Sequence, residues 1–249
     1  MNKMGPGIPS PSMEADTIAL PEIVDADAWQ AAHAALLTEE KALTKARDAL
    51  AAKRRRMPMT RVKTDYRFDG PEGEVDLLGL FQGRRQLIVY RFFYAPDVVN
   101  WPDGACPGCS WLADSTTHAA HLAARDTTLM FVTAAPQNMV ATYKQRMGWD
   151  VPFRTLVGDE FSRDFNVAEM FGFNVFIRDG ADVYRTYFVN GRGGEAIGTM
   201  FSLLDLTPLG RQEEWEDSPP GRPQGKPYVW WRLHDSYGDI AAPNLPPES

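Results

Sequence analysis

The sequence predicts an α/β fold with a parallel sheet at its core. Residues 86–95 and 128–135 are nearly continuous apolar runs, as expected for strands that are buried on both faces. A helix-length segment, 106–125, separates them, and a second one, 136–149, follows. Strands that alternate with helices indicate parallel pairing, because each crossover helix returns the chain to the same end of the sheet.

The N-terminal part of the chain is expected to form a leader and a helical arm. Residues 1–24 are rich in Pro, Ser and Gly, which predicts a flexible leader. Residues 25–58 are the expected helical arm, in which residues 28–56 lack Pro and Gly, are dominated by Ala, Leu, Glu, Lys and Arg, and predict one long helix. Asp25 or Asp27 can cap its start, and Pro58 ends it.

One apolar stripe runs along this arm. Large apolar side chains recur at every seventh position, at Trp29, Leu36, Leu43 and Leu50. Polar residues occupy the positions of the second seam that a coiled coil needs. We therefore expect the arm to bury its stripe against its own domain or against a second subunit in a homodimer.

The main domain is expected to span residues 59–206. Its remaining elements are a strand at 61–68, a short apolar segment at 73–81, a hairpin at 173–189 and a helix at 193–206. An Asp-Gly pair marks the turn of the hairpin, because glycine adopts the backbone angles that a tight turn requires.

The C-terminal residues, 207–249, are expected to form an irregular extension that packs on the domain. Pro and Gly return here, and an aromatic segment interrupts them. Trp230 and Trp231 are the expected anchors, because large aromatic side chains are usually buried. His234 and Asp235 are adjacent, and neighbouring side chains rarely point the same way, so we expect no catalytic pair there.

The composition argues against several classes of function. The chain has 249 residues and a net charge of -7, which argues against binding to nucleic acid. No apolar run approaches the roughly 18 residues of a membrane span, so no membrane partner is expected. The first 25 residues lack a secretory signal, and 2 cysteines are too few for a secreted disulfide scaffold. These features predict a cytoplasmic protein.

A C-x-x-C motif is the strongest chemical signal in the chain. Cys106-Pro107-Gly108-Cys109 holds both cysteines, follows the first buried strand and opens a helix. At a helix start, free backbone N–H groups and the positive end of the helix dipole stabilise a thiolate. We expect Cys106 to attack an unknown thiol or disulfide substrate and Cys109 to resolve the mixed disulfide, without a cofactor.

A zinc site is an alternative use of these cysteines. His118 and His121 lie downstream in the same predicted helix, in the order C-x2-C-x8-H-x2-H. This spacing is tighter than that of a zinc finger. A straight helix places His118 about 13 Å from Cys109, so four ligands cannot converge and no metal site is expected.

Several segments together resemble a known family. They are FDGPEGEVDLLGLFQGRRQLIVYRFFYAPD, CPGCSWLAD, HLAARDTTLMFVTAAP, RMGWDVPF, DVYRTYFVNGRG and LLDLTPLGR. The family is domain of unknown function 899, described as predicted dithiol-disulfide oxidoreductases with a thioredoxin-like fold. The resemblance covers roughly residues 28–240 and implies that fold here. It also implies that Cys106 and Cys109 are the redox pair, with Trp111 and Asp114 in the same signature.

Two other functions stay open at this point. One is a non-catalytic thioredoxin-like binding protein, and the other is a peroxiredoxin-like thiol peroxidase. Peroxiredoxins need Thr or Ser three residues before the reactive cysteine, where this chain has Asp103. Thioredoxins place a cis-proline before a central strand, where residues 170–173 are Met-Phe-Gly-Phe, so substrate docking must differ. Asp97, Asp103 and Asp114 are the candidates for proton transfer to or from the second cysteine.

Overall fold

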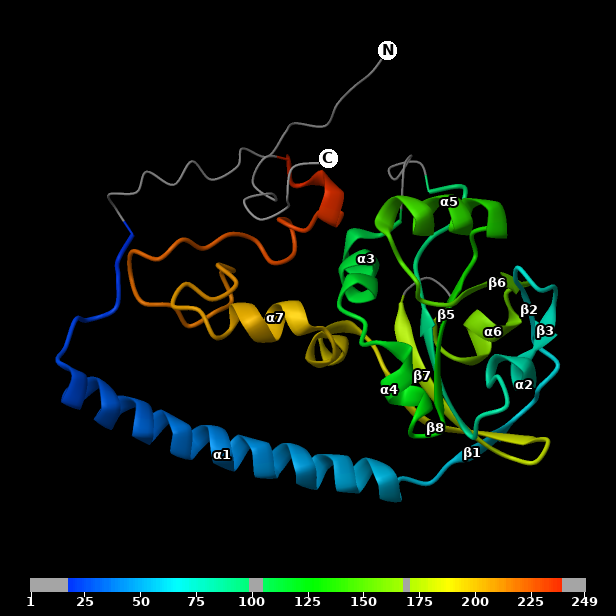
Figure 1. The fold of residues 1–249 in the computed structure, drawn as a ribbon, viewed down its shortest axis with the longest axis horizontal. Helices are drawn as coiled ribbons and strands as arrows, with labels where there is room; N and C mark the ends of the chain where they lie inside the picture. Colours follow the sequence, from blue (N-terminus) through cyan, green and yellow to red (C-terminus); the bar gives the residue numbers. More distant parts are fainter. Residues whose placement is uncertain (1–17, 99–104, 168–170, 239–249) are drawn as a thin grey trace, which may run out of the picture.

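The computed structural model of the chain describes residues 18–98, 105–167 and 171–238. Residues 1–17 of the predicted leader and 239–249 of the predicted extension lie outside this part. The described strands form one eight-stranded sheet in the order β1-β8-β7-β4-β5-β6-β2-β3 (Figure 1). The strands are β1 (Thr60–Val62), β2 (Arg67–Asp69), β3 (Val75–Asp76), β4 (Gln86–Arg91), β5 (Thr127–Thr133), β6 (Phe153–Val157), β7 (Gly172–Asp179) and β8 (Asp182–Val189).

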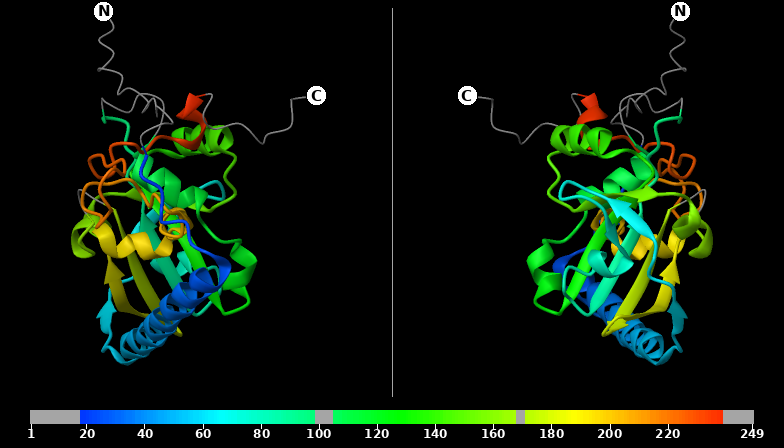
Figure 2. Two further views of the ribbon diagram at one scale, coloured as in Figure 1. Left: turned by 90° about the vertical axis from the view of Figure 1, so that its left-hand side faces the viewer. Right: turned by 90° about the vertical axis from the view of Figure 1, so that its right-hand side faces the viewer.

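Helices cover both faces of the sheet. The helices are α1 (Ala26–Arg56), α2 (Leu77–Leu80), α3 (Pro107–Asp114), α4 (Ala119–Ala123), α5 (Gln137–Met147), α6 (Glu160–Asp164) and α7 (Thr199–Leu204), with 3-10 turns η1 (Gly191–Ile197) and η2 (His234–Ser236). α3 and α5 pack on one face, and α2 and α6 pack on the other (Figure 2). Successive strand residues point to opposite faces, so β4 sends Tyr90 into one core and Leu87 into the other. None of the helices in the described residues is both long and apolar enough to cross a membrane.

The central strands confirm the predicted α/β class. β4 and β5 lie in the two apolar runs and pair in parallel, and β6 pairs in parallel with β5. β7 lies antiparallel on the other side of β4 and forms the predicted hairpin with β8. Gly180 adopts a φ of 58° in its turn, in the left-handed region that favours glycine. A parallel pair joined through the cysteine-bearing helix α3, with a hairpin beside it, is the arrangement of the thioredoxin fold.

The α1 helix forms as predicted, but its apolar stripe does not pack on its own domain. Asp25 caps it by accepting a hydrogen bond from the backbone N–H of Ala28 at 2.8 Å. No α1 side chain is buried, and Leu43 is 62% exposed. The helix runs along the outside of the molecule (Figure 1). Packing of the stripe on its own domain is therefore wrong for the single chain, whereas packing on a second subunit stays a prediction.

The N-terminal strands differ from the expected single strand at 61–68. The structure has two strands there: β1 pairs with β8 at one edge of the sheet, and β2 pairs with β6 near the other. The apolar segment at 73–81 forms β3 and α2. The sequence did not predict β6 or α6. The alternation of apolar and polar side chains predicts that a strand forms but not which strand it pairs with. It therefore could not predict that the chain passes from one edge of the sheet to the other between β1 and β2.

Two predicted helices are each divided in the structure. The expected helix 106–125 ends at Asp114, and α4 begins after His118, whose Nδ1 accepts a hydrogen bond from the N–H of Ala120 at 3.2 Å. The expected helix 193–206 is interrupted at Gly198. A Cβ at Gly198 would lie 1.8 Å from the Trp111 ring, so the close approach of this ring requires glycine.

The C-terminal extension is organised around a buried carboxylate. Glu213 has no exposed surface. Its oxygens accept hydrogen bonds from Trp215 Nε1 at 2.6 Å, from the Tyr228 backbone N–H at 2.8 Å and from Trp230 Nε1 at 2.9 Å. A buried charge needs such donors to offset its lost hydration, and these three hold the extension in one conformation.

Candidate functional site

The C-x-x-C motif lies where the chain passes from β4 into α3. Cys106 directly precedes the first helical turn, and Pro107 takes the first helical position, where its missing N–H costs nothing. The backbone N–H of Cys106 donates to the carbonyl of Phe93 at 3.2 Å, and its carbonyl accepts from the N–H of Ser110 at 3.0 Å. These bonds tie the start of α3 to the residues that follow β4.

The two thiols differ in exposure and in pKa. Cys106 is half-buried, and its pKa is lowered to about 7. The main cause is a hydrogen bond with the Cys109 thiol, and the backbone N–H groups of Cys109 and Gly108 add to it, whereas burial opposes the shift. Burial raises the pKa of Cys109, which is 1% exposed, well above its ordinary value. Near neutral pH, Cys106 is partly thiolate while Cys109 keeps its proton.

The buried sulfur of Cys109 accepts hydrogen bonds from two groups of the sheet. The Tyr90 hydroxyl donates at 3.2 Å, and the backbone N–H of Phe93 donates at 3.4 Å. Burial, with the neighbouring Cys109 sulfur, raises the pKa of Tyr90 well above its ordinary value, so its hydroxyl stays protonated. Both donors stabilise a thiolate on Cys109 once one forms.

The predicted carboxylates lie at different distances from the motif. Asp97 is exposed in the loop after β4, and Asp103 lies outside the described residues. Asp114 ends α3, about 7.5 Å along the helix axis from Cys109 at 1.5 Å per residue. The structure therefore does not bring Asp114 to the buried thiol.

Asp114 instead connects α3 to two other segments. Its Oδ1 accepts a hydrogen bond from Trp149 Nε1 at 2.6 Å and lies 2.8 Å from His234 Nδ1. Asp235, next to His234, pairs with Arg146 at 2.6 Å. His234 and Asp235 therefore take separate partners and anchor the extension to α3 and α5.

The histidines of the zinc alternative are not near the motif along one helix. His118 caps the start of α4 and His121 lies within it; both are exposed, and α4 is separate from α3. Within the described residues, no group of three or more His, Cys, Asp or Glu side chains could hold a metal ion.

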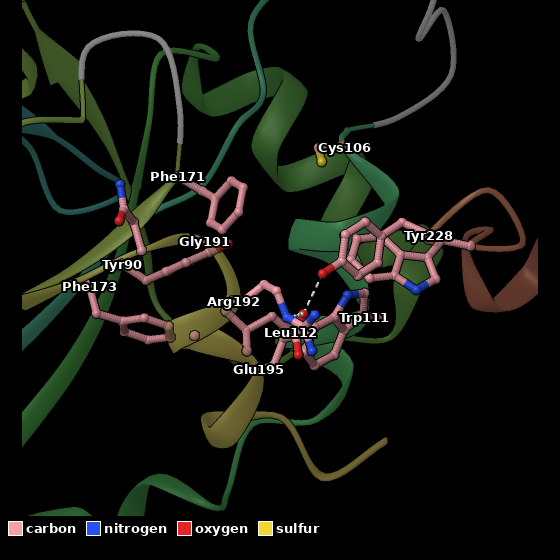
Figure 3. A pocket seen from close by; sticks show the side chains of 14 residues that line it. Tyr90, Cys106, Trp111, Leu112, Phe171, Phe173, Gly191, Arg192, Glu195 and Tyr228 are labelled. Atoms are coloured by element: carbon pink, nitrogen blue, oxygen red, sulfur yellow. Dashed lines mark hydrogen bonds and ion pairs between the residues drawn. The ribbon is translucent and has the colours of Figure 1, made fainter. Parts of the chain in front are cut away.

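An aromatic cavity of about 320 Å³ opens beside Cys106 (Figure 3). Its walls come from α3, β4, the start of β7, the segment 190–195 and the C-terminal extension. The aromatic members of the lining are Tyr90, Trp111, Phe171, Phe173, Tyr228 and Trp231. The sequence did not predict this cavity, because its walls come from segments far apart in the chain.

Two residues of the site escaped the sequence-based reasoning. Tyr90 lies within a nearly continuous apolar run, and its hydroxyl is one of the few side-chain polar groups there, so only that hydroxyl could have pointed to its role. Trp231 was expected only as an anchor of the extension, yet its ring packs against Trp111 in the cavity wall, with centroids 5.8 Å apart.

Comparison with known proteins places the chain in a family. A family model described as a bacterial protein of unknown function (DUF899) matches residues 18–237. The chain belongs to this DUF899 family. The match includes the C-x-x-C motif and confirms the resemblance seen in the sequence segments, while the family description states no activity. No curated protein matches the sequence.

Two solved structures that resemble this DUF899 chain share little sequence with it. A hypothetical protein from Sinorhizobium meliloti is 14% identical over 55% of this chain and 78% of its own, with a TM-score of 0.35. The apo Sco1 protein from Thermus thermophilus is 16% identical over 57% of this chain and 88% of its own, with a TM-score of 0.34. Neither likeness is close enough to carry a functional argument.

Proposed function

We propose that this DUF899 protein is a thiol–disulfide oxidoreductase. The observation that carries the proposal is the asymmetry of the two thiols. Cys106 is partly accessible with a pKa of about 7, whereas Cys109 is buried with a raised pKa. The thiolate is the attacking species in exchange, and a thiol whose pKa is near the ambient pH attacks most effectively.

The reaction proceeds in two exchange steps. The Cys106 thiolate attacks one sulfur of a substrate disulfide, the substrate S–S bond breaks, and one substrate thiolate leaves and takes up a proton. Cys109 then loses its proton and attacks the Cys106 sulfur of the mixed disulfide. The second substrate thiol leaves, the protein holds a Cys106–Cys109 disulfide, and two electrons have passed to the substrate. In the proposed cytoplasmic setting, cellular dithiols return the pair to the reduced state.

A redox titration of the pair tests this proposal. The protein is equilibrated in mixtures of reduced and oxidised dithiothreitol, free thiols are alkylated, and the mass reports how many labels were added. We expect both labels to disappear together and reversibly. No disulfide under oxidant, or a bond only between chains, would show that the two thiols are not a redox pair and would favour a non-catalytic binding protein.

Single-cysteine variants assign the roles. With a disulfide substrate, Cys109→Ser should accumulate a mixed disulfide on Cys106, and Cys106→Ser should accumulate none. An assay with hydrogen peroxide tests the peroxidase alternative. A peroxidase reduces peroxide over many turnovers with dithiothreitol as the reductant, whereas we expect turnover with disulfides instead. Accumulation of the mixed disulfide on Cys109 instead would reverse the assignment.

A further inference from the structure

The C-terminal extension covers the helix surface beside the attacking cysteine. A Cβ at Gly108, between the two cysteines, would lie 2.4 Å from Trp231 Cζ3. The Trp231 ring therefore lies directly on the motif, and only glycine leaves room for it. Tyr228 packs against Trp231 with ring centroids 4.5 Å apart. This cover occupies part of the surface on which a folded protein would have to lie to reach Cys106.

The space under this cover is the aromatic cavity, and Cys106 lines it (Figure 3). Aromatic rings from the sheet, α3 and the extension surround it. Phe171 stands just before β7 and lines the cavity too. Such a site stabilises a bound apolar ligand in proportion to the apolar area that is removed from water.

The charged groups in the cavity wall neutralise one another. The Glu195 carboxylate accepts a hydrogen bond from the Tyr228 hydroxyl and lies 3.0 Å from Arg211. Arg211 also pairs with the Asp205 carboxylate at 2.7 Å, so two carboxylates balance the two guanidinium groups at this wall. Arg192 lies 3.5 Å from Glu195, and its guanidinium lies 4.0 Å from the centroid of the Trp215 ring. A ligand with a net charge would therefore lose hydration without gaining a free counter-charge from these residues.

The volume sets the size of the ligand. A cavity of roughly 150 Å³ holds one benzene molecule. The cavity of about 320 Å³ beside Cys106 has room for about two such rings. A compound of two aromatic rings joined by a disulfide matches this volume and brings its sulfurs next to the cysteine.

We propose that the cavity binds a small, uncharged, apolar disulfide as the substrate of Cys106, in preference to charged disulfides or proteins. This substrate class rests on the proposed exchange chemistry. The reduced pair converts Ar–S–S–Ar into two Ar–SH, breaking one S–S bond and forming the Cys106–Cys109 bond. An external dithiol, dithiothreitol in the assay, then reduces the protein and is itself oxidised.

Matched probes test the substrate class. 4,4′-Dithiodipyridine is uncharged near neutral pH and has two rings, and 4,4′-dithiodibenzoate has the same framework with two carboxylates. Each rate is divided by the rate of the same probe with glutathione, to remove intrinsic reactivity. We expect the normalised rate to be at least tenfold higher for the uncharged probe, and insulin reduction to be slower than either.

Glycine substitutions provide the structural control. Gly194 lines the cavity, and a Cβ there meets only Phe173, at 4.0 Å, so the position has room for a side chain and Gly194→Leu adds apolar bulk at the cavity wall. Gly225 is exposed, and a Cβ there meets only the Gln212 carbonyl at 3.8 Å, so Gly225→Leu is the matched control. We expect Gly194→Leu to lower the rate with the uncharged probe at least tenfold and Gly225→Leu to leave it unchanged.

A binding measurement separates the cavity from the chemistry. 1,2-Diphenylethane replaces both sulfurs of an aromatic disulfide with carbon and should change the fluorescence of the tryptophans in the wall of the parent protein but not of Gly194→Leu. The substrate class would be overturned if the pair titrates reversibly but both probes give equal normalised rates, or if insulin is reduced faster than the probes. Either result would leave the exchange function standing. An absent disulfide in the titration would overturn both.

Discussion

Replacement of Tyr90 by phenylalanine should slow the second exchange step and leave the first unchanged. The Tyr90 hydroxyl donates to Cys109 Sγ at 3.2 Å from a buried position, and the substitution removes that donor without removing the ring. Hydrogen bonds to charged groups contribute about 1.5–3 kcal/mol, against about 0.5–1.5 kcal/mol for neutral ones. The difference, on the order of 1.4 kcal/mol, corresponds to about one pKa unit. We therefore expect the pKa of Cys109 to rise by about one unit. The thiolate fraction then falls about tenfold while each thiolate becomes a stronger nucleophile, so resolution should slow about three- to fourfold.

The assay follows the mixed disulfide directly. Reduced protein is mixed with a disulfide, quenched in acid at set times and analysed by mass. In Tyr90→Phe the mixed disulfide should build up, whereas the initial attack by Cys106 keeps its rate. Tyr143→Phe is the matched control, because Tyr143 is also buried on this face but bonds the Ser110 hydroxyl at 2.9 Å. Equal resolution rates in the parent and both variants would refute a role of the Tyr90 hydroxyl.

Three further predictions concern the motif, the carboxylate and the arm. The alkylation rate of Cys106 should rise with pH through a midpoint near 7, because its pKa is lowered to about 7 and only the thiolate reacts; a midpoint above 8.5 would contradict this, and the label is located by mass. Asp114→Ala should lower the free energy of unfolding by about 1–3 kcal/mol, because Trp149 Nε1 loses its acceptor, without changing the rate at which Cys109 resolves the mixed disulfide; slower resolution would return Asp114 to the proton-transfer candidates for Cys109. Leu43→Ala should change the unfolding free energy of the single chain by less than about 1 kcal/mol, because Leu43 is 62% exposed, and a lower apparent mass in sedimentation would reveal that a second subunit covers it.

The local features of the fold follow from the chain order of apolar and turn residues. The runs at 86–95 and 128–135 predicted β4 and β5, since a strand buried on both faces needs apolar residues throughout. The Asp-Gly pair predicted the hairpin. Asp25 and Asp27 were the two expected caps for the long helix, and Asp25 is the one that caps α1. These signals act over a few residues and depend little on the rest of the molecule.

The partners of each element depend on contacts between distant segments. The sequence predicted Cys106 and Cys109 as a pair at a helix start, because two residues of spacing fix their separation. It could not show that Tyr90 donates to the buried thiol, because that bond requires β4 and α3 to pack.

The aromatic cavity beside Cys106 depends most strongly on the assembled fold. The Trp231 ring lies over Gly108 although 122 intervening residues separate them in the chain. No local pattern records such a contact, because its free energy arises only when the extension, held by the buried Glu213, meets the start of α3. The order of residues thus places the two cysteines at one helix start, while the packing of the extension on the domain forms the cavity beside Cys106.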